Sequence, residues 1–528
     1  MTFHQEIIDL ILTKKIQTKD DLHRMKMKLS KTYHLKTIPP DSEILAQLPP
    51  DVSENEFVFA LLRKKSTRTI SGVAIIAAMT SPETCPHGRC VPCPGGPTQH
   101  TPQSYTGYEP AAMRALFNDF DAYQQVKNRL QQLHAIGHST DKVDLIIMGG
   151  TFTARTPDYQ EWFVKRCYDA LNEHRSSSLQ SAQKINETAP SRCIGLTIET
   201  RPDWLRLQHA DHILHLGATR VELGVQTVYD DVLYQMKRGH TVSDTMAATR
   251  ISKDAGLKVC YHMMPGLPGS TPQKDLSAFR TLFRNQNFQP DMIKIYPTLI
   301  VEGTPLFELW KKGEYQPLTT EAASTLIARM KTFIPTWVRI QRIQRDIPVQ
   351  KICEGIQKSN LRQLVEEEMR RQGTSCHCIR CREIGLLSQK KTIHVSDLQI
   401  KCLKHHYKAS ESEEIFLSLE DKKQKVLIGY LRLRNPNNPY RKELMQDPCM
   451  IIRELKILGR EAPLNERTKE AFQHRGYGKQ LIEAAERICI EEFDKRHLFV
   501  LSGIGVKPYY RKLGFIDDGV YQKKILSS

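Results

Sequence analysis

Short apolar runs alternate with amphipathic stretches along the middle of the chain. Six of these runs predict buried strands, at residues 72–79, 143–149, 193–199, 220–225, 258–263 and 291–296. Helical periodicity fills most of the gaps, as at 157–174, 203–216 and 241–255. Strands that alternate with helices predict an α/β fold whose parallel sheet is closed or half-closed into a barrel.

The pattern changes at both ends of the chain. Residues 1–70 carry an apolar stripe of helical period with lysines and arginines outside it. After a charged, cysteine-rich stretch, apolar runs at 415–420, 425–434 and 449–458 predict strands, and 481–493 predicts an amphipathic helix. We therefore expect four parts: a basic helical region at 1–70, the barrel at 71–360, a linker at 361–390 and a C-terminal α/β domain at 391–528.

Composition and charge narrow the class of protein. A chain of 528 residues, of which 40% are hydrophobic, is long enough for two or three cores. Its formal net charge of +17 favours a polyanionic partner, with nucleic acid as the first choice and the basic N-terminal region as a tRNA-binding arm. Thirteen cysteines, several of them clustered and without a secretory signal, fit a reducing, cytoplasmic setting. No run approaches the roughly 20 apolar residues of a membrane span.

The loop CPHGRCVPCPGG at 85–96 is the strongest candidate for chemistry. Cys85, Cys90 and Cys93 stand in the spacing C-x4-C-x2-C, and no fourth thiol is near them in the sequence. Thiolates are the usual ligands of iron–sulfur clusters, and a cubane held by three of them leaves one iron open for chemistry. A zinc site with His87 as the fourth ligand is the alternative.

Polar and glycine-rich residues follow the predicted strands. In a parallel barrel the carboxyl ends of the strands line the active site. Here these ends carry Gly149 and Gly150, Glu199 to Pro202, Gln226, the stretch 264–269, and Lys294 to Tyr296. Their recurrence at the same edge as the cysteine loop predicts one shared cofactor pocket.

The linker holds a second group of cysteines. Cys376, Cys378 and Cys381 lie within six residues, which predicts a structural zinc site. The fourth ligand is open among Cys353, Cys402, His377 and water. The alternative is three unrelated surface cysteines. It is less favoured, because exposed free thiols are a liability for a protein.

A phosphate-binding pattern marks the C-terminal domain. The turn at 473–478 has the form Q-x-x-G-x-G and opens the predicted helix, so its backbone N–H groups are placed for a pyrophosphate. A Tyr-Tyr-x-x-x-Gly-Phe segment follows at 509–515. This order resembles the GNAT acetyltransferases, which hold acetyl-coenzyme A in this way.

The whole chain resembles one family, the catalytic subunit of Elongator in its archaeal and bacterial form. The resemblance runs through CPHGRCVPCPGGP (85–97), DKVDLIIMGGTF (141–152), IETRPD (198–203), RGHT (238–241), IKIYPTL (293–299), IRCREIG (379–385) and YYRKLGF (509–515). It implies a radical S-adenosylmethionine partial (β/α) barrel, a zinc-binding linker and a GNAT domain. Most radical enzymes of this class use C-x3-C-x2-C with an aromatic residue before the last cysteine, whereas this chain has a gap of four and Pro92.

The resemblance also implies cofactors and the residues that bind them. A [4Fe-4S] cluster would fall on Cys85, Cys90 and Cys93, in a pocket with S-adenosylmethionine that includes Gly149 and Gly150. Acetyl-coenzyme A (acetyl-CoA) would contact Lys142, Glu454, Leu455, Lys456, Ile457, Tyr477, Gly478, Lys479 and Tyr510. Lys142 and Tyr510 are the expected catalytic residues.

The implied activity is that of a tRNA uridine acetyltransferase. The family chemistry cleaves S-adenosylmethionine reductively, abstracts hydrogen from the acetyl methyl group, attaches that carbon to carbon 5 of the wobble uridine and leaves a carboxymethyl group after hydrolysis. The anticodon stem-loop would be the substrate. The short cysteine gap and the CHCIRC cluster indicate a member that acts without the other Elongator subunits, with a homodimer as one arrangement. Because a thioester has to reach a radical made in the barrel, we expect the two pockets to open toward each other.

Two other functions fit parts of the sequence. The first is a protein lysine acetyltransferase with a structural iron–sulfur cluster, in which Glu454 acts as a general base. The second is a non-catalytic tRNA-binding scaffold. A non-catalytic scaffold would be expected to lack the cysteines or the coenzyme loop, and this sequence has both.

Overall fold

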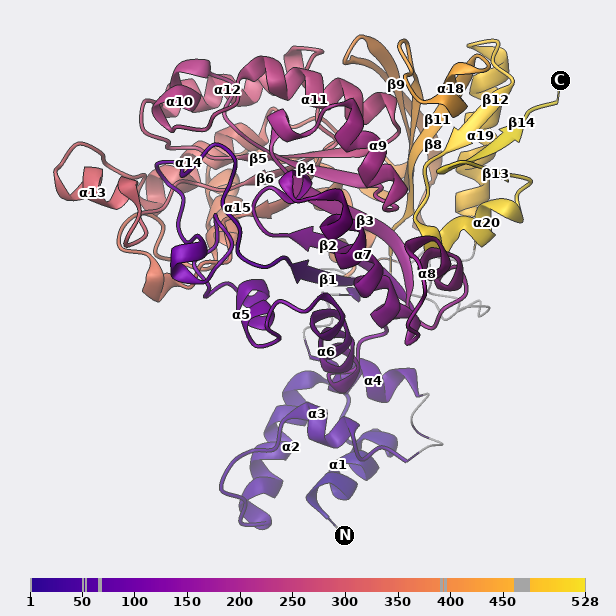
Figure 1. The fold of residues 1–528 in the computed structure, drawn as a ribbon. Coiled ribbons are helices and arrows are strands. Elements are labelled where there is room, and N and C mark those ends of the chain that lie inside the picture. The colour runs from indigo at the N-terminus through magenta and orange to yellow at the C-terminus, as the bar shows by residue number, and fades with distance from the viewer. Residues whose placement is uncertain are drawn as a thin grey trace.

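The computed structural model describes residues 2–49, 52, 55–64, 69–389, 393, 397–459 and 475–527. Figure 1 shows a small helical bundle at the N-terminus, a large central α/β body and a second sheet at the C-terminus. Each of the two larger bodies is built on a seven-stranded sheet.

The central sheet is wholly parallel and follows the order of the chain. Its strands are β1 (Ala74–Met79), β2 (Lys142–Met148), β3 (Arg192–Thr200), β4 (Arg220–Gln226), β5 (Lys258–Met263), β6 (Met292–Ile295) and β7 (Arg339–Ile343). Within the described residues β1 and β7 stand at the two ends of the strand order, so the barrel is open between them. The predicted partial barrel is confirmed. The prediction missed β7, whose sequence RIQRI is too polar to read as a buried run.

Helices cover the outer face of this sheet. They are α6 (Ala122–Ala135), α7 (Pro157–Asn172), α8 (Leu179–Asn186), α9 (Leu207–His215), α11 (Val242–Asp254), α12 (Pro272–Arg284) and α14 (Thr320–Lys331). In β2 the alternate residues Val143, Leu145 and Ile147 are fully buried in the core that these helices share. The intervening residues, such as Asp144 and Ile146, therefore face the inside of the barrel. Three further helices, α5 (Pro110–Leu116), α10 (Asp230–Gln235) and α13 (Pro305–Lys311), pack in smaller apolar clusters outside this shared core.

Four helices form the N-terminal bundle: α1 (Phe3–Leu12), α2 (Lys19–Thr32), α3 (Asp41–Leu45) and α4 (Glu56–Leu62). The apolar stripe of α1 packs inward through Ile7, Ile8 and Ile11. In Figure 1 the bundle lies below α6 and β1. It has its own hydrophobic core, separate from the core of the barrel.

The C-terminal sheet has the order β13-β14-β12-β11-β10-β9-β8. Its strands are β8 (Lys401–Ala409), β9 (Ser412–Asp421), β10 (Val426–Asn435), β11 (Cys449–Ile457), β12 (His497–Val500), β13 (Ile516–Asp518) and β14 (Tyr521–Ile525). Its helices are α18 (Lys442–Met445), α19 (Tyr477–Glu491) and α20 (Lys507–Arg511). Among the described strands of this sheet, only β11 and β12 pair in parallel, and they pair over four residues each. The rest of β11 runs on without β12, so the two strands separate as in the V-shaped opening of an acetyltransferase sheet.

Buried ion pairs join the C-terminal sheet to the barrel. Arg453 of β11 donates to Asp291 at 2.6 Å and to Glu414 at 3.0 Å. Arg434 of β10 donates to Asp254 at 2.6 Å and to Glu414 at 2.9 Å. Asp291 directly precedes β6 and Asp254 ends the helix before β5. The C-terminal domain therefore packs on the amino-terminal ends of the barrel strands, as Figure 1 also shows.

The linker completes the fold with three short helices, α15 (Leu361–Arg371), α16 (Ile379–Arg382) and α17 (Ile384–Leu387). Arg382 in this segment donates to Glu420 of β9 and to the backbone oxygen of Thr336. The linker thus contacts both sheets. No helix in the described ranges is long and apolar enough to cross a bilayer.

Candidate active site

The cysteine loop follows β1 and lies at the carboxyl edge of the barrel. Cys90 and Cys93 are buried and Cys85 is half-buried. The Sγ atom of Cys90 lies 2.9 Å from Nε2 of His87 and 3.4 Å from a guanidinium nitrogen of Arg238. These contacts place the imidazole of His87 and the guanidinium of Arg238 against the sulfur of Cys90.

The spacing of the three sulfurs separates a cluster from a single metal ion. One metal ion needs ligand atoms within a few ångströms of one another. Among the described residues, only two groups of three His, Cys, Asp or Glu side chains have ligand atoms all within 4.8 Å, and Cys85, Cys90 and Cys93 are not one of them. The loop therefore fits an inorganic cluster better than a zinc ion, and His87 bonds to a cysteine sulfur instead of completing a zinc site.

Two glycines bring the end of β2 against this loop. Gly149 has a φ of 132°, and a Cβ atom there would lie 2.0 Å from Oγ1 of Thr80. Gly150 has a φ of 81°, and its Cβ position lies 3.7 Å from Sγ of Cys85. Only glycine allows both this backbone and this approach. Both predicted cofactor-binding glycines thus lie beside the cysteine loop.

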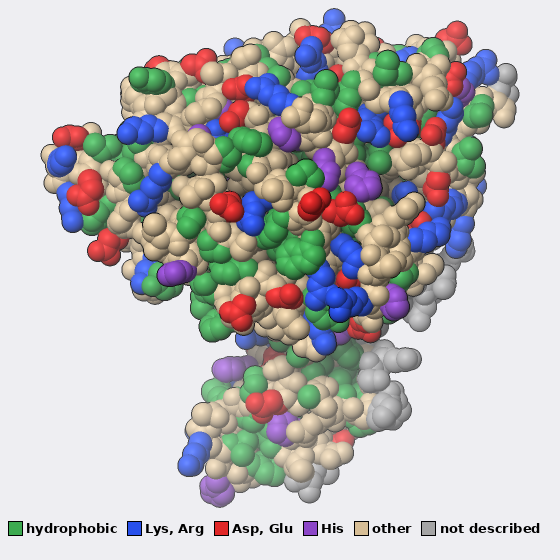
Figure 2. Space-filling model, in the orientation of Figure 1, with side chains coloured by type: hydrophobic (Ala, Val, Ile, Leu, Met, Phe, Trp, Pro, Cys, Tyr) green, Lys and Arg blue, Asp and Glu red, His purple; other side chains and the backbone are tan. Residues whose placement is uncertain are grey.

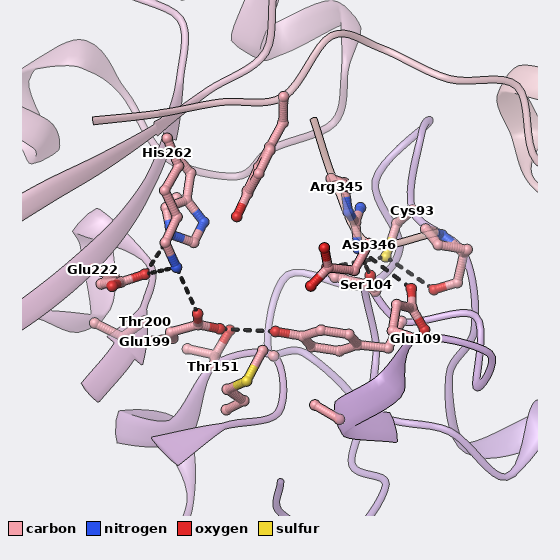
Figure 3. A pocket seen from close by; sticks show the side chains of 18 of the residues that line it. Cys93, Ser104, Glu109, Thr151, Glu199, Thr200, Glu222, His262, Arg345 and Asp346 are labelled. Atoms are coloured by element: carbon pink, nitrogen blue, oxygen red, sulfur yellow. Dashed lines mark hydrogen bonds and ion pairs between the residues drawn. The ribbon is translucent and has the colours of Figure 1, made fainter. Parts of the chain in front are cut away.

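A cavity of about 550 Å³ opens behind the loop and runs inside the barrel. It reaches from the cysteines down to Ile75 of β1 and Ile146 of β2. Arg345, after β7, and Glu109, before α5, stand on the side where the barrel is open (Figure 3). The volume is in the range of small-molecule and cofactor sites.

Buried charges line the far wall of the cavity. Lys294 of β6 makes ion pairs with Glu222 of β4 and, at 3.4 Å, with Glu199 of β3. Nε2 of His262 lies 2.8 Å from Glu222, and the hydroxyl of Tyr105 donates to Glu199 at 2.8 Å. Figure 3 shows the labelled members of this chain pointing into the cavity.

Mutual pairing decides the ionisation of these groups. Burial by itself would raise the pKa of Glu222, but Lys294 and His262 outweigh it and hold that pKa well below its usual value. Burial would likewise lower the pKa of Lys294, and Glu222 reverses this and raises it. Burial raises the pKa of Tyr105, and Glu199 adds to the shift. The cavity therefore presents a charged ammonium at Lys294, a charged carboxylate at Glu222 and a protonated phenol at Tyr105.

The predicted coenzyme residues gather where the C-terminal sheet opens. Glu454 to Ile457 form the part of β11 beyond its pairing with β12, and Tyr477 to Lys479 begin α19. A Cβ atom on Gly478 would lie 2.8 Å from the hydroxyl of Tyr509, so this turn packs on α20. Tyr510 in α20 is buried against Phe515. The residues Gln473 and His474 of the predicted loop lie outside the described residues.

Comparison with known proteins agrees with this arrangement. The Radical SAM superfamily model matches residues 80–281 and the Radical_SAM C-terminal domain model matches 290–371. The ELP3 N-terminal domain model matches 1–70 and the Acetyltransferase (GNAT) family model matches 386–515. A protein of Methanocaldococcus jannaschii named tRNA uridine(34) acetyltransferase is 53% identical over 92% of this chain and 90% of its own length. This chain belongs to the Elongator protein 3 family.

Other members of the family extend the likeness. Elongator complex protein 3 of Saccharomyces cerevisiae is 41% identical over 96% of this chain and 92% of its own length. The solved structure of Methanocaldococcus infernus Elp3, lacking residues 1–46, has a TM-score of 0.77 at 48% identity. That match covers 87% of this chain and all of the solved one. The predicted family and fold class are therefore confirmed.

Lys142 lies apart from the cysteine loop. It is the first residue of β2, and its ammonium pairs with Asp141 at 3.6 Å. Its register partner Arg192 packs against Gly505, because a Cβ atom on this glycine would lie 2.5 Å from that of Arg192. Lys142 thus lies at the end of the barrel strands that faces the GNAT domain. The predicted coenzyme residues and the cysteine loop therefore lie at opposite ends of the barrel strands.

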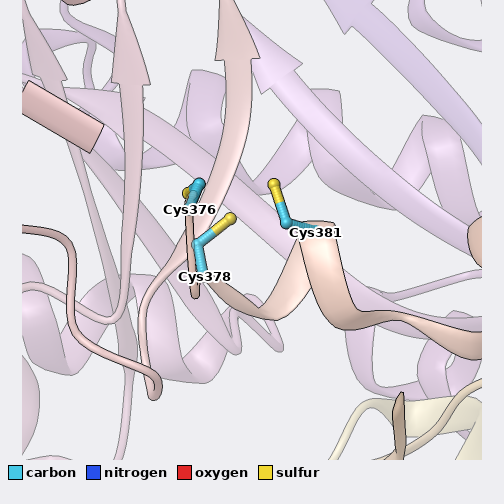
Figure 4. A group of neighbouring side chains, drawn as sticks. All are labelled: Cys376, Cys378 and Cys381. Carbon is cyan, nitrogen blue, oxygen red and sulfur yellow. The ribbon is translucent and has the colours of Figure 1, made fainter. Parts of the chain in front are cut away.

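The linker cysteines converge as the zinc prediction requires. The Sγ atoms of Cys376, Cys378 and Cys381 all lie within 4.8 Å of one another, and Figure 4 shows the three side chains turned toward one another. Among the described residues no fourth His, Cys, Asp or Glu joins the group. The candidate ligand His377 instead lies 3.3 Å from the hydroxyl of Ser375.

Sequence reasoning missed the middle of the cavity wall. Glu222 and His262 stand within strands that read as apolar runs, RVELGV and KVCYHM. A signal was present, because each is the charged or polar residue on the alternate face of a strand whose other face is apolar. The residues at strand ends, Glu199 and Lys294, were found by their position.

Proposed function

We propose that this protein converts the wobble uridine of tRNA to its 5-carboxymethyl form, with acetyl-CoA as the carbon source and S-adenosylmethionine as the radical source. One observation carries the proposal: a three-cysteine loop and an opened GNAT sheet are attached to the two ends of the same barrel. Neither the cysteine loop nor the GNAT sheet by itself explains why the chain carries the other. Relatives that align over nearly their whole length are named tRNA uridine(34) acetyltransferase.

The residues of the cysteine loop fit a four-iron cluster, with Cys85, Cys90 and Cys93 as its three protein ligands. When bound, such a cluster supplies through its open iron the electron that cleaves S-adenosylmethionine. The chain itself encloses the reaction. Gly149 and Gly150 place the end of β2 beside the cysteine loop, and the barrel walls surround the cavity.

The cavity also has the groups that a uracil base needs. Uracil presents two carbonyl acceptors on either side of one N–H donor. Lys294 offers an ammonium, Tyr105 a hydroxyl and Glu199 a carboxylate, all facing the same space. Glu199 is the lining carboxylate that is shared between Lys294 and Tyr105, so these three side chains form one connected polar group facing the base.

We assign the acetyl-CoA site from the GNAT fold of the C-terminal domain. Acetyl-CoA would enter between β11 and β12, with its pyrophosphate at the start of α19 and its acyl end toward the barrel. Lys142 at the facing barrel edge and Tyr510 near the opening are the side chains we assign to the coenzyme. The linker cysteines would hold zinc between the two bodies.

The rival activity, lysine acetylation with Glu454 as general base, is disfavoured by the contacts of that residue. Glu454 accepts from Nε of Arg432 at 2.9 Å and from the hydroxyl of Tyr430 at 3.0 Å. Burial would raise its pKa, but Arg432 outweighs burial and lowers it. A carboxylate held in this way is a weak base.

The proposed cellular compartment and partners rest on the cysteines of the chain and on the proposed activity. All thirteen cysteines are free thiols, which fits a reducing, cytoplasmic compartment. The anticodon stem-loop of tRNA would be the bound substrate. We propose that the protein acts without other Elongator subunits, alone or as a homodimer, as its short cysteine gap indicates.

Mass spectrometry of tRNA nucleosides tests the proposal. Anaerobic protein, unmodified tRNA, S-adenosylmethionine, dithionite and acetyl-CoA should yield 5-carboxymethyluridine at the wobble position. The Cys90→Ser variant should yield none, because each thiolate is one of three anchors of the cluster. Omitting acetyl-CoA should abolish the modified nucleoside. A complete reaction without modified uridine, or acetyl groups found only on protein lysines, would refute the proposal.

A further inference from the structure

Large apolar side chains stand exposed on α5, beside the mouth of the cavity. Met113 is 42% exposed, Leu116 38% and Phe117 81%. Of the large hydrophobic residues in the described part of the chain, only Tyr234 is more exposed than Phe117. We refer to Met113, Leu116 and Phe117 as the α5 platform. Figure 2 shows apolar side chains gathered over α5, just above the N-terminal bundle.

The α5 platform continues the wall of the cavity. Pro110, Ala111 and Arg114 of the same helix line the cavity. Phe117 is three residues beyond Arg114 and four beyond Met113, so it is a neighbour of both on the helix surface. Its backbone keeps helical angles at the end of α5. Ala112 and Ala115 hold the opposite side of the helix against β1. Phe117 thus stands at the end of α5, next to the side of the helix that lines the cavity.

The surroundings of the α5 platform are positively charged. Seven Lys or Arg side chains and four carboxylates line the cavity. The carboxylate of Glu109 lies 3.8 Å from Arg345, and Asp346 pairs with Arg342, so these two acids and two arginines offset each other and the lining keeps an excess of three cations. Lys351 sits 3.9 Å above the ring of Tyr108, next to α5. A rim of this kind attracts phosphates.

Aromatic rings among cations are the means by which proteins hold single-stranded RNA. Bases stack on exposed aromatic side chains, while arginines and lysines follow the backbone. The cavity has room for a base but not for its neighbours in a chain, which must stay outside at the rim.

We propose that the α5 platform stacks a nucleotide next to the target uridine, so that the anticodon loop docks on α5 while one base enters the cavity. The inference rests on the proposed function and adds the surface by which the RNA is held. Phe117 is its central contact. Met113 and Leu116 extend the apolar surface on which the ring and the base lie.

Binding of an anticodon stem-loop RNA with 2-aminopurine beside the wobble uridine tests this inference, with anaerobically prepared full-length protein at fixed salt. The parent should quench the 2-aminopurine fluorescence. Phe117→Ala should weaken binding by about 5-fold to more than 100-fold, the range found for loss of one stacked base, and abolish the quenching. Phe117→Trp should restore both.

Tyr234→Ala is the matched control, since Tyr234 is 87% exposed and lies on α10, outside the cavity lining. It should bind and quench as the parent does. Because Phe117 is exposed, iron content and circular dichroism should be unchanged in Phe117→Ala.

The outcomes separate this inference from the proposed function. Equal affinity and equal quenching for Phe117→Ala and the parent would overturn the inference while leaving the proposed function intact. A change in sedimentation of Phe117→Ala with unchanged RNA binding would also overturn it, by assigning the platform to a second copy of the chain. Absence of stem-loop binding by the parent would refute both.

Discussion

At the scale of single residues, Lys294 holds the polar interior of the barrel together. Its ammonium is the shared partner of Glu199 and Glu222, and both carboxylates point into a space that excludes solvent. Two buried carboxylates without a cation between them would repel each other and lose their hydration. The cavity can keep its charged lining only while Lys294 is present.

Lys294→Met should lower the thermal unfolding midpoint strongly, since breaking a buried ion pair costs about 3–5 kcal/mol. In the parent the pKa of Glu222 is depressed, so its stabilising contribution is present above the unfolded value near 4.5 and is lost as pH falls toward the folded value. Without Lys294, only His262 and Arg220 oppose the burial of Glu222, so its pKa rises. The deficit of the variant should therefore narrow from pH 7 to pH 5.

Lys274→Met is the control for this prediction. Lys274 pairs with Asp231, whose side chain is 61% exposed, and exposed pairs contribute about 0–1 kcal/mol. Calorimetric scans of both variants and the parent at several pH values give the comparison. A deficit for Lys294→Met that stays constant between pH 7 and pH 5 would contradict the assignment to Glu222.

At the scale of elements, the proposed zinc site would hold together the short helices of the linker. The helices α16 and α17 have four residues each, too short to be stable without tertiary contacts. Serine at Cys376, Cys378 and Cys381 should remove zinc, loosen the contact between barrel and GNAT domain, and leave iron content unchanged. Elemental analysis measures both metals on one sample. Zinc retained by the triple variant would disprove the site.

The helix α2 shows which basic residues of the N-terminal bundle are available to RNA. Lys26 is buried and donates to Asp41 at 2.6 Å, so it serves the bundle itself. Lys28 and Lys31 are exposed. Replacing these two by glutamine should lower the salt dependence of tRNA affinity by about 1–2 in log–log slope. Lys26→Met should instead destabilise the bundle. An unchanged slope for the double variant would remove the bundle from the tRNA site.

At the scale of the whole molecule, buried charge joins the two sheets into one unit. Arg453 lies between Asp291 of the barrel and Glu414 of β9, and all three side chains are fully buried. An ion pair on the surface spans the same two bodies, between Arg511 and Glu187. The two pairs therefore allow a direct comparison of buried and exposed charge at one interface.

Arg453→Met should separate the unfolding of the GNAT domain from that of the barrel, because it leaves Asp291 and Glu414 buried without their main cation. We expect two transitions by differential scanning calorimetry where the parent shows one. Arg511→Met should change the profile little, since the Arg511 side chain is 31% exposed. A single unshifted transition for Arg453→Met would show that apolar packing joins the domains.

The sequence by itself determined the architecture and the chemistry of the cofactors. Six strands were visible because a strand buried on both faces needs a continuous apolar run, and the seventh was hidden because Arg339 and Gln341 keep β7 polar. The spacing of Cys85, Cys90 and Cys93 indicated a cluster, because all three thiol ligands belong to one loop and can be counted from the sequence. Such features depend on neighbours in the chain.

Only the tertiary structure decided how these parts face one another. Lys142, Glu454 and the cysteine loop are each recognisable in the sequence, yet nothing local says that the first two lie at one end of the barrel strands and the third at the other. The chain of Glu222, His262 and Lys294 likewise joins strands that are up to 72 residues apart. The physical reason is that ion pairing and burial act between groups brought together by folding, so their partners cannot be read from their sequence neighbours.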